Sequence, residues 1–288
     1  MHRYILHNDR IHDASEPVLS PGQVGLLAGW GVFSTLHVAD GVLFAWERHW
    51  ARMQKDAALL RVPLPEDSEL VRKRLLELVE ANRAYDATLR VVVVRNCGGV
   101  WEGPSTGRAS DLIALTSGLK DWGAGVKLAY VQQARHAACE FAGTKILSWA
   151  MNLRWVEEAH EKGFDEVILL NERGEVSECT SANIFIAQGT SVWTPPLSSG
   201  CLPGVTRDIL LHEIQVPGFT IGEKTLVPAD IAAADDVFIT STTRALLPVL
   251  EVDGKKTGGR SAAQKVWQAA FAKYVEGYIA ERRMTVTR

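Results

Sequence analysis

Residues 144–185 read T-K-I-L-S-W-A-M-N-L-R-W-V-E-E-A-H-E-K-G-F-D-E-V-I-L-L-N-E-R-G-E-V-S-E-C-T-S-A-N-I-F, and this stretch decides the fold. Lys145 stands near its start and Glu178 near its end. A lysine taken by itself is most often a solvated surface residue. Lys145, however, has apolar residues on both sides, an environment in which an ammonium is poorly hydrated, as a Schiff-base lysine requires.

The residues between the lysine and the glutamate predict a helix followed by a hairpin. Trp149, Leu153 and Val156 recur at helical spacing, and Gly163 ends the helix. Residues 166–170 predict a strand, and a turn then leads into a second strand that carries the glutamate. A chain that runs out along a helix and returns along a hairpin can bring the glutamate beside the lysine.

This stretch resembles the signature of fold-type IV pyridoxal-phosphate enzymes, which include branched-chain aminotransferases, D-amino-acid aminotransferases and aminodeoxychorismate lyases. The resemblance implies pyridoxal 5'-phosphate as cofactor, with Lys145 as its internal aldimine and Glu178 bound to the pyridine nitrogen. A carboxylate there keeps the ring nitrogen protonated, so the ring can accept the electron pair left when the substrate loses its α-proton. The released lysine amine can then carry that proton.

The resemblance also implies a fold class and a division of the chain. The expected fold is α/β, with a smaller N-terminal α/β domain and a larger C-terminal domain that contains a β pseudo-barrel. A length of 288 residues with 47% hydrophobic content is enough for two such domains. We expect the small domain over residues 1–118, a linker over 119–125 and the cofactor-binding domain over 126–288.

Charge and cysteine content exclude several function classes. The 31 basic and 34 acidic residues give a net charge of −3, and no basic run indicates a nucleic-acid partner. No apolar run is long enough for a signal peptide or a membrane span, so we expect a cytoplasmic protein without a membrane partner. The four cysteines form no C-x-x-C pair, and we expect no metal site.

Three further motifs resemble the family's phosphate-binding parts. His49 and Arg52 match its H-x-x-R, and a guanidinium can bind phosphate through two hydrogen bonds. Residues 202–207, L-P-G-V-T-R, match its L-P-G-[IV]-T-R at the start of a helix, where backbone N–H groups attract anions. With the turn S-T-T after residue 240, the resemblance implies cofactor binding by Arg52, Lys145, Glu178, Leu202, Val205, Thr206 and Thr242.

Other positions resemble substrate-binding parts of the family. The aromatic of a glycine-rich G-W-G-V-F segment is expected to face the substrate, and a loop after residue 95 is expected to cover it. Arg244 could bind a distal carboxylate such as that of 2-oxoglutarate, although a solvated arginine remains an alternative. The implied substrate-binding residues are Phe33, Thr35, Arg95, Trp101, Thr243 and Arg244.

The function expected from these motifs is transfer of an amino group from an amino acid or amine to a 2-oxo acid. A 4-amino-4-deoxychorismate lyase, which eliminates pyruvate, stays open as the alternative. Ala28 and Val93 depart from the branched-chain enzymes, whereas Val100 and Trp101 depart from the D-amino-acid enzymes. The sequence therefore assigns no subfamily and no donor. Members of the family are usually homodimers, and we expect one here.

Patterns outside these motifs predict local structure. The apolar run Leu89–Arg95 predicts a strand buried on both faces. Ser68 is expected to cap a helix that carries Leu70 and continues to about Asn82. In the last helix, a stripe four residues apart is expected to pack, namely Val266, Ala270, Tyr274 and Tyr278.

Overall fold

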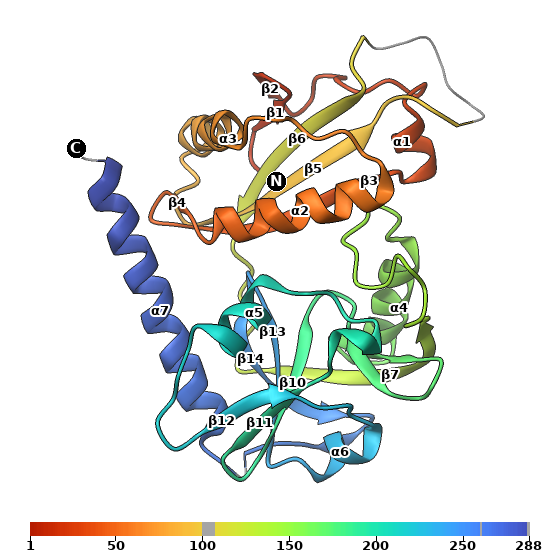
Figure 1. Cartoon of the computed structure of the whole chain (residues 1–288), viewed down its shortest axis with the longest axis vertical. Helices are drawn as coiled ribbons and strands as arrows, with labels where there is room; N and C mark the ends of the chain where they lie inside the picture. Colours follow the sequence, from red (N-terminus) through yellow and green to blue (C-terminus); the bar gives the residue numbers. More distant parts are fainter. Residues whose placement is uncertain (100–106, 260, 287–288) are drawn as a thin grey trace. The chain divides into compact units, whose positions relative to one another are not determined.

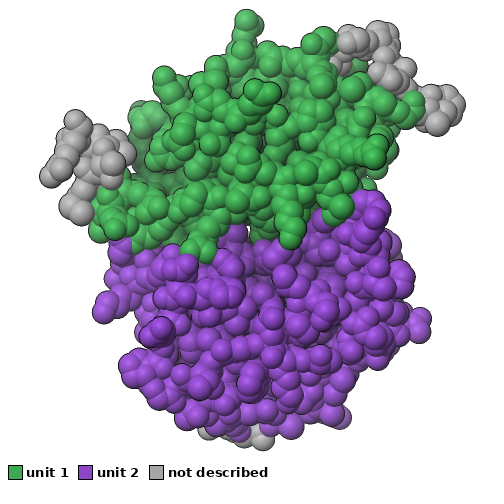
Figure 2. All heavy atoms as spheres, in the orientation of Figure 1, with its two compact units in different colours: residues 1–120, 145–149, 278–288 green, residues 121–144, 150–277 purple. Residues whose placement is uncertain are grey.

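The computed structural model describes residues 1–99, 107–259 and 261–286. Val100 and Trp101, which depart from the D-amino-acid enzymes in sequence, lie outside these residues. The predicted substrate contact of Trp101 therefore also lies outside them. The chain forms two compact units, coloured separately in Figure 2. Unit 1 contains Met1–Lys120, Lys145–Trp149 and Tyr278–Arg288, and unit 2 contains Asp121–Thr144 and Ala150–Gly277. The expected domain boundaries stay a prediction.

Unit 1 is built on an antiparallel sheet with the order β2-β1-β6-β5-β3-β4 among the described residues (Figure 1). Its strands are β1 (Tyr4–His7), β2 (Arg10–Asp13), β3 (Gly31–Ala39), β4 (Val42–Leu43), β5 (Ala87–Arg95) and β6 (Ser110–Gly118). Its helices are α1 (Val24–Ala28), α2 (Trp46–Leu60) and α3 (Ser68–Asn82).

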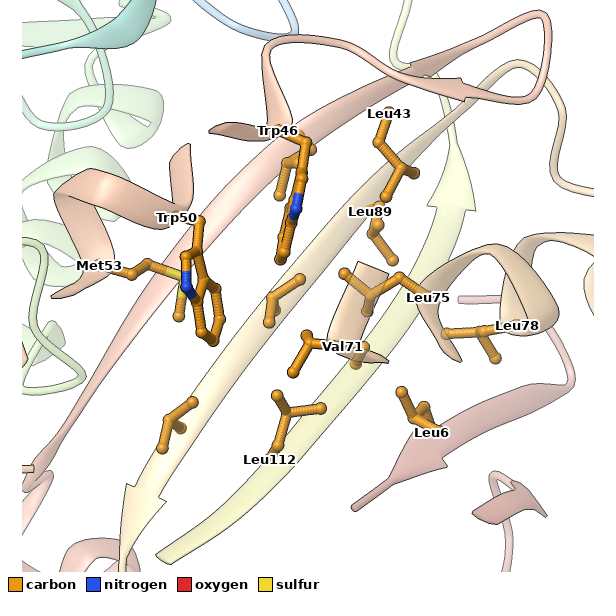
Figure 3. Close-up of a cluster of buried hydrophobic side chains, with 14 of the residues drawn as sticks. Leu6, Leu43, Trp46, Trp50, Met53, Val71, Leu75, Leu78, Leu89 and Leu112 are labelled. Atoms are coloured by element: carbon orange, nitrogen blue, oxygen red, sulfur yellow. The ribbon is translucent and has the colours of Figure 1, made fainter. Parts of the chain in front are cut away.

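The core of unit 1 lies between one face of this sheet and the helices α2 and α3 (Figure 3). Alternate residues of β3 and β5 point into it because successive side chains of a strand face opposite ways. The side chains around which it packs are Leu6, Trp46, Trp50, Met53, Val71, Leu75, Leu78, Leu89 and Leu112.

Strand β5 is buried on one face rather than two. Leu89, Val91 and Val93 are fully buried, whereas Arg90 and Val92 are partly exposed. β5 lies between the antiparallel partners β3 and β6, and both helices cover the same side of the sheet. The prediction of a strand buried on both faces is therefore wrong, because a run of valines does not show which face stays uncovered.

Helix α3 has the predicted length but a different cap. The Asp67 side chain, not that of Ser68, accepts hydrogen bonds from the N–H groups of Glu69 and Leu70, at 3.0 and 2.9 Å. The Leu70 side chain points away from the core and is 46% exposed. Asp67 is the better capping residue here because its carboxylate also favours the positive end of the helix dipole.

Unit 2 contains a mixed sheet with the order β12-β11-β10-β13-β14-β7-β8-β9, and β15 pairs with β14. Its strands are β7 (Val126–Arg135), β8 (Glu166–Asn171), β9 (Val176–Cys179), β10 (Asn183–Gln188), β11 (Ser191–Thr194), β12 (Thr220–Glu223), β13 (Asp236–Ser241), β14 (Ala245–Val252) and β15 (Lys255–Lys256). Its helices are α4 (Ala150–Glu161), the 3-10 helix η1 (Leu197–Ser199), α5 (Val205–His212) and α6 (Pro228–Ala233).

Helix α7 (Ala263–Val286) contributes residues to both units. Its buried stripe comprises Trp267, Phe271 and Tyr278, whereas Val266 is 36% exposed. Of the predicted stripe, Tyr278 is buried, Ala270 and Tyr274 are half-buried and Val266 is exposed, so only the first half of the stripe is wrong by one residue. The shift follows from the aromatic residues, whose larger apolar surface gains more from burial than that of valine or alanine.

Helix α4 also buries a different face from the predicted one. Ala159 is buried, and Trp155 packs partly buried against the same cluster, but Leu153 is 58% exposed. Trp149 precedes the helix and belongs to unit 1.

The expected fold class, a mixed α/β chain with a curled sheet in its second half, is confirmed. Within the described residues, no helix is long and apolar enough to cross a membrane.

A matched pair of substitutions on α3 tests this packing. Leu75 is fully buried, so Leu75→Ala should lower the free energy of unfolding by about 2–5 kcal/mol through lost burial and a cavity. Leu70→Ala, on the exposed side, should change it by less than about 0.5 kcal/mol. Chemical denaturation measures both values, and equal losses would show that the assigned core face is wrong.

Candidate functional site

The segment Lys145–Trp149 is held by strand β3 in unit 1. The Phe33 N–H donates to the Lys145 carbonyl at 3.1 Å, and the Leu147 N–H donates to the Gly31 carbonyl at 3.0 Å. A Cβ atom at Gly31 would lie 2.4 Å from the Val93 carbonyl oxygen and 2.5 Å from Leu147 Cδ1. Only glycine therefore allows the lysine segment to approach the strand so closely.

The Lys145 side chain lies over an aromatic ring. Its Nζ is 4.5 Å from the centroid of the Phe33 ring, which in turn makes an edge contact with Trp149. On the backbone side, the Lys145 N–H donates to Asp56 Oδ2 at 3.1 Å. Burial raises the pKa of the Asp56 carboxyl. The lysine backbone is thus fixed from two directions while its amine lies against an apolar ring.

Helix α2 presents a polar cluster on the face that packs against β3. Arg52 Nη2 donates to Ser34 Oγ at 3.0 Å, and the same oxygen lies 2.8 Å from Nδ1 of His49. The His49 ring is fully buried, and this burial, together with the charges of Arg52 and Lys145, holds its pKa well below 6.5. His49 is therefore neutral, and it and Arg52 share one helix face as their spacing predicts.

In unit 2, Glu178 lies on β9 and is nearly buried, with 8% of its surface exposed. Its Oε1 is 3.3 Å from Arg135 Nε, and its Oε2 accepts a hydrogen bond from the Leu202 N–H at 2.9 Å. Arg135 in turn donates from Nη2 to Asn152 Oδ1 at 3.2 Å. Both carboxylate oxygens therefore have a fixed partner.

The start of helix α5 in unit 2 is suited to an anion. Gly204 is the N-cap, and a Cβ atom there would lie 2.1 Å from Asn183 Oδ1. The first N–H groups of a helix have no intrahelical acceptor. The Thr206 side chain is 2% exposed, and among the described residues its Oγ1 has no hydrogen-bond partner. A buried hydroxyl without a hydrogen-bond partner lowers the stability of the fold. A ligand that accepts a hydrogen bond from this hydroxyl therefore fits this position.

The turn between β13 and β14 consists of Thr242, Thr243 and Arg244. Just before it, the buried hydroxyls of Thr240 and Ser241 also have no hydrogen-bond partner among the described residues. Helix α5 packs against β13. Partnerless hydroxyls therefore occur on two packed elements of unit 2, which fits a group with several acceptor oxygens such as a phosphate.

Arg244 is engaged by the protein itself. Its guanidinium lies 3.9 Å over the Trp122 ring, donates to the Ser181 carbonyl at 3.1 Å and lies 3.4 Å from Glu166 Oε2. Its side chain is only 8% exposed. A buried arginine paired with a buried carboxylate serves the packing of unit 2, so the alternative of a solvated arginine is wrong. The expected distal-carboxylate role stays a prediction.

Arg95 is engaged in a similar way at the end of β5. Its Nε donates to the Cys97 carbonyl and its Nη1 to the Arg61 carbonyl, both at 2.7 Å. The guanidinium also lies 4.1 Å over the Trp30 ring. These contacts tie down the end of the strand, and the expected substrate-binding role of Arg95 stays a prediction.

The buried thiols are not activated. Burial raises the pKa of Cys179 well above its usual value and that of Cys201 to about 12. Thiolates are the reactive form, so neither residue can act as a nucleophile near neutral pH. Within the ranges that the structure describes, no group of three or more histidine, cysteine or acidic side chains could hold a metal ion.

Four residues of these clusters were not singled out from the sequence. Asp56 follows Arg52 by one helical turn, and that spacing could have indicated it. Ser34 faces α2 by strand alternation, which a sequence shows only once the buried face is known. Arg135 and Asn152 reach Glu178 from other elements, and no local pattern could have revealed them.

Comparisons with known proteins give a consistent result. The Amino-transferase class IV profile matches residues 31–252. The D-alanine aminotransferase of Bacillus licheniformis is 29% identical over 258 residues, which cover 88% of this chain and 90% of that protein. A putative branched-chain-amino-acid aminotransferase of Methanocaldococcus jannaschii is 28% identical over 266 residues, or 89% and 90% of the two chains.

A solved structure shares the fold. It is a hypothetical aminotransferase from Mycobacterium tuberculosis in its PLP-bound form, with a TM-score of 0.83 and 23% identity. The similarity covers 94% of this chain and 98% of that one.

The buried His49 predicts a pH dependence of stability. Because the folded pKa lies below that of the unfolded chain, its contribution is complete above pH 6.5 and is lost as the pH falls. Below pH 6.5 the wild-type free energy of unfolding should fall more steeply than that of His49→Asn, by a difference approaching about 1.4 kcal/mol per pH unit. Parallel curves for wild type and His49→Asn would contradict the assignment.

Proposed function

Because this chain belongs to the class IV aminotransferases, whose cofactor is pyridoxal 5'-phosphate, we propose that Lys145 carries that cofactor and moves the substrate proton. The family match spans residues 31–252, and the expected resemblance, enzyme class and cofactor are confirmed. The protein is a pyridoxal-phosphate-dependent transaminase. Nothing in the fold, the site or these relatives favours the lyase alternative.

The observation that carries the lysine assignment is the fixed backbone of Lys145. Strand β3 and Asp56 hold its carbonyl and its N–H, while Nζ lies 4.5 Å from the Phe33 ring. Proton transfer requires the amine to reach the same substrate atom in each half-reaction. A rigid backbone keeps the amine within reach of that atom. The Phe33 ring also holds the amine in place from one side.

Glu178 is the proposed partner of the cofactor's ring nitrogen. Bound pyridoxal 5'-phosphate supplies a ring that accepts the electron pair of the broken C–H bond, and this needs a protonated nitrogen. Arg135 and the Leu202 N–H hold the Glu178 carboxylate in one orientation. A nearly buried, oriented carboxylate can hold a proton at the ring nitrogen without moving.

The phosphate is proposed to lie at the start of α5, where Leu202 precedes the helix and Val205 and Thr206 begin it. The partnerless Thr206 hydroxyl and the helix N–H groups support this role. From the other described motifs we propose Thr242 as a further phosphate ligand and Arg52 as the phosphate's arginine. Arg52 is already oriented by its hydrogen bond to Ser34, so little side-chain freedom is lost on binding.

The substrate-binding residues, the oligomeric state and the cellular location are also proposals. Phe33 lies under the lysine amine and Thr35 lies two residues further on the same strand face, which supports a substrate-facing role for both. Thr243 is proposed from its place in the turn. We further propose a homodimer in the cytoplasm, with small-molecule amino donors and 2-oxo acids as its partners.

Reductive trapping tests the lysine assignment. Borohydride treatment of the loaded enzyme, followed by proteolysis and mass spectrometry, should place the reduced cofactor on the peptide that contains Lys145. Lys145→Ala should lose this adduct, and amino donors should no longer convert the cofactor's aldehyde absorbance to that of the amine. Lys162→Ala, an exposed lysine directly after α4, should keep both signals. An adduct on another lysine of the wild-type enzyme would refute the assignment.

The phosphate site is tested by the cofactor affinity of Thr206 variants. Thr206→Val keeps the size of the side chain but removes the hydroxyl, so the dissociation constant for pyridoxal 5'-phosphate should rise about 10- to 100-fold. Thr206→Ser should bind nearly as the wild type does. Thr220→Val, on an exposed strand residue, is the matched control. An unchanged constant in Thr206→Val would remove Thr206 from the site.

A further inference from the structure

Ser34 is a fully buried hydroxyl in unit 1 that joins two polar side chains of one helix. It lies on β3, and 0% of its surface is exposed. Arg52 Nη2 donates a hydrogen bond to its Oγ at 3.0 Å, and His49 Nδ1 lies 2.8 Å from the same oxygen. Within the part of the chain that the structure describes, these two groups are the hydrogen-bond partners of the hydroxyl. The strand therefore reaches the H-x-x-R motif of α2 through a single oxygen atom.

The hydroxyl lies in an otherwise apolar row of the strand. Val32 and Leu36 point into the core of unit 1, and Ser34 shares their face because side chains alternate along a strand. Helix α2 covers this face, and His49 and Arg52 lie on one side of it because three residues separate them. A hydroxyl buried among apolar side chains destabilises the fold unless it is hydrogen-bonded. Its two partners on α2 therefore explain why a serine is stable at this position.

The donor inventory fixes the direction of both hydrogen bonds. A guanidinium only donates, so Ser34 accepts from Arg52 and its single O–H remains for His49. Burial and nearby cations hold the pKa of His49 well below its usual value, and a neutral imidazole has one nitrogen without a proton. If Nδ1 carried the proton, the buried Ser34 O–H would have no acceptor among the described residues, which would destabilise the fold. Nδ1 is therefore the acceptor, and Nε2 carries the proton.

This directed pair of hydrogen bonds orients the Arg52 guanidinium. The buried His49 ring sets the direction of the Ser34 O–H, so a lone pair of Oγ faces Arg52 Nη2. An arginine held in this way loses less conformational entropy when it binds a ligand. Ser34 and the neutral His49 carry no formal charge, so they orient the arginine without competing with an anion for its charge. Such an arrangement suits an arginine whose ligand is a phosphate.

We propose that Ser34 is a positioning residue for the cofactor's phosphate: it donates to His49 Nδ1, accepts from Arg52, and so presents Arg52 to the phosphate group. This inference rests on the proposed function, in which Arg52 is the phosphate's arginine. Ser34 acts through Arg52 and does not itself contact the cofactor. It therefore contributes to the affinity for pyridoxal 5'-phosphate but not to that for pyridoxal, which has no phosphate.

The wild-type protein tests the direction of the hydrogen bonds without any cofactor. Proton–nitrogen correlation spectra of the apoenzyme, labelled with nitrogen-15 at histidine, distinguish protonated from unprotonated ring nitrogens. The signals of His49 are assigned by their loss in His49→Asn. Near neutral pH they should show an unprotonated Nδ1 and a protonated Nε2. A protonated Nδ1 would overturn the proposal, because the Ser34 O–H could then not be donated to His49.

Cofactor affinity tests whether Ser34 acts on the phosphate. Absorbance titration of the apoenzyme measures the dissociation constants of pyridoxal 5'-phosphate and pyridoxal. Ser34→Ala should raise the constant for pyridoxal 5'-phosphate about 10-fold and change that for pyridoxal by less than about twofold. Ser117→Ala, on β6 of the same sheet, should match the wild type with both compounds. Equal losses for the two compounds would overturn the proposal, because Ser34 would then serve only the packing.

A double-mutant cycle with Arg52→Met separates failure of this inference from failure of the proposed function. Arg52→Met should weaken pyridoxal 5'-phosphate binding more than Ser34→Ala does, and adding Ser34→Ala to it should change the constant by less than about twofold. Additive losses would show that Ser34 does not act through Arg52. If Arg52→Met weakens binding but Ser34→Ala does not, only the role of Ser34 is wrong. An unchanged constant in Arg52→Met would refute the proposed phosphate role of Arg52 and this inference with it.

Discussion

The backbone pairing of the Lys145 segment with the start of β3 is the constraint on which the site depends. Two hydrogen bonds join residues 145–147 to Gly31 and Phe33, and the pairing is possible only because Gly31 lacks a side chain. The same register sets the lysine amine over the Phe33 ring. Moving the segment by one residue would reverse which side chains point to that ring, so the chemistry is tied to a strand register.

Unit 2 has its own fixed point in the Glu178 carboxylate. A buried carboxylate is destabilising unless its oxygens are paired, and here Arg135 and the Leu202 N–H supply that pairing. The hydrogen bond to Leu202 also links the glutamate to the start of α5, where the Thr206 hydroxyl lies buried without a partner. Polar groups that the protein leaves unsatisfied therefore occur beside groups that it holds rigidly, as expected where a ligand completes the structure.

The sequence predicted what local spacing determines and missed what depends on tertiary pairing. The shared helix face of His49 and Arg52 follows from a separation of three residues, and the family motifs followed from contiguous residues. The contact of Arg135 with Glu178 could not be predicted, because it depends on how separate strands pair.

A crystal structure of the enzyme saturated with pyridoxal 5'-phosphate tests the central claim most directly. The account predicts continuous electron density from Lys145 Nζ to the cofactor, a Glu178 oxygen within hydrogen-bond distance of the ring nitrogen, and the phosphate on the Thr206 hydroxyl. Density that joins the cofactor to a different lysine, or a Glu178 side chain turned into solvent, would contradict it.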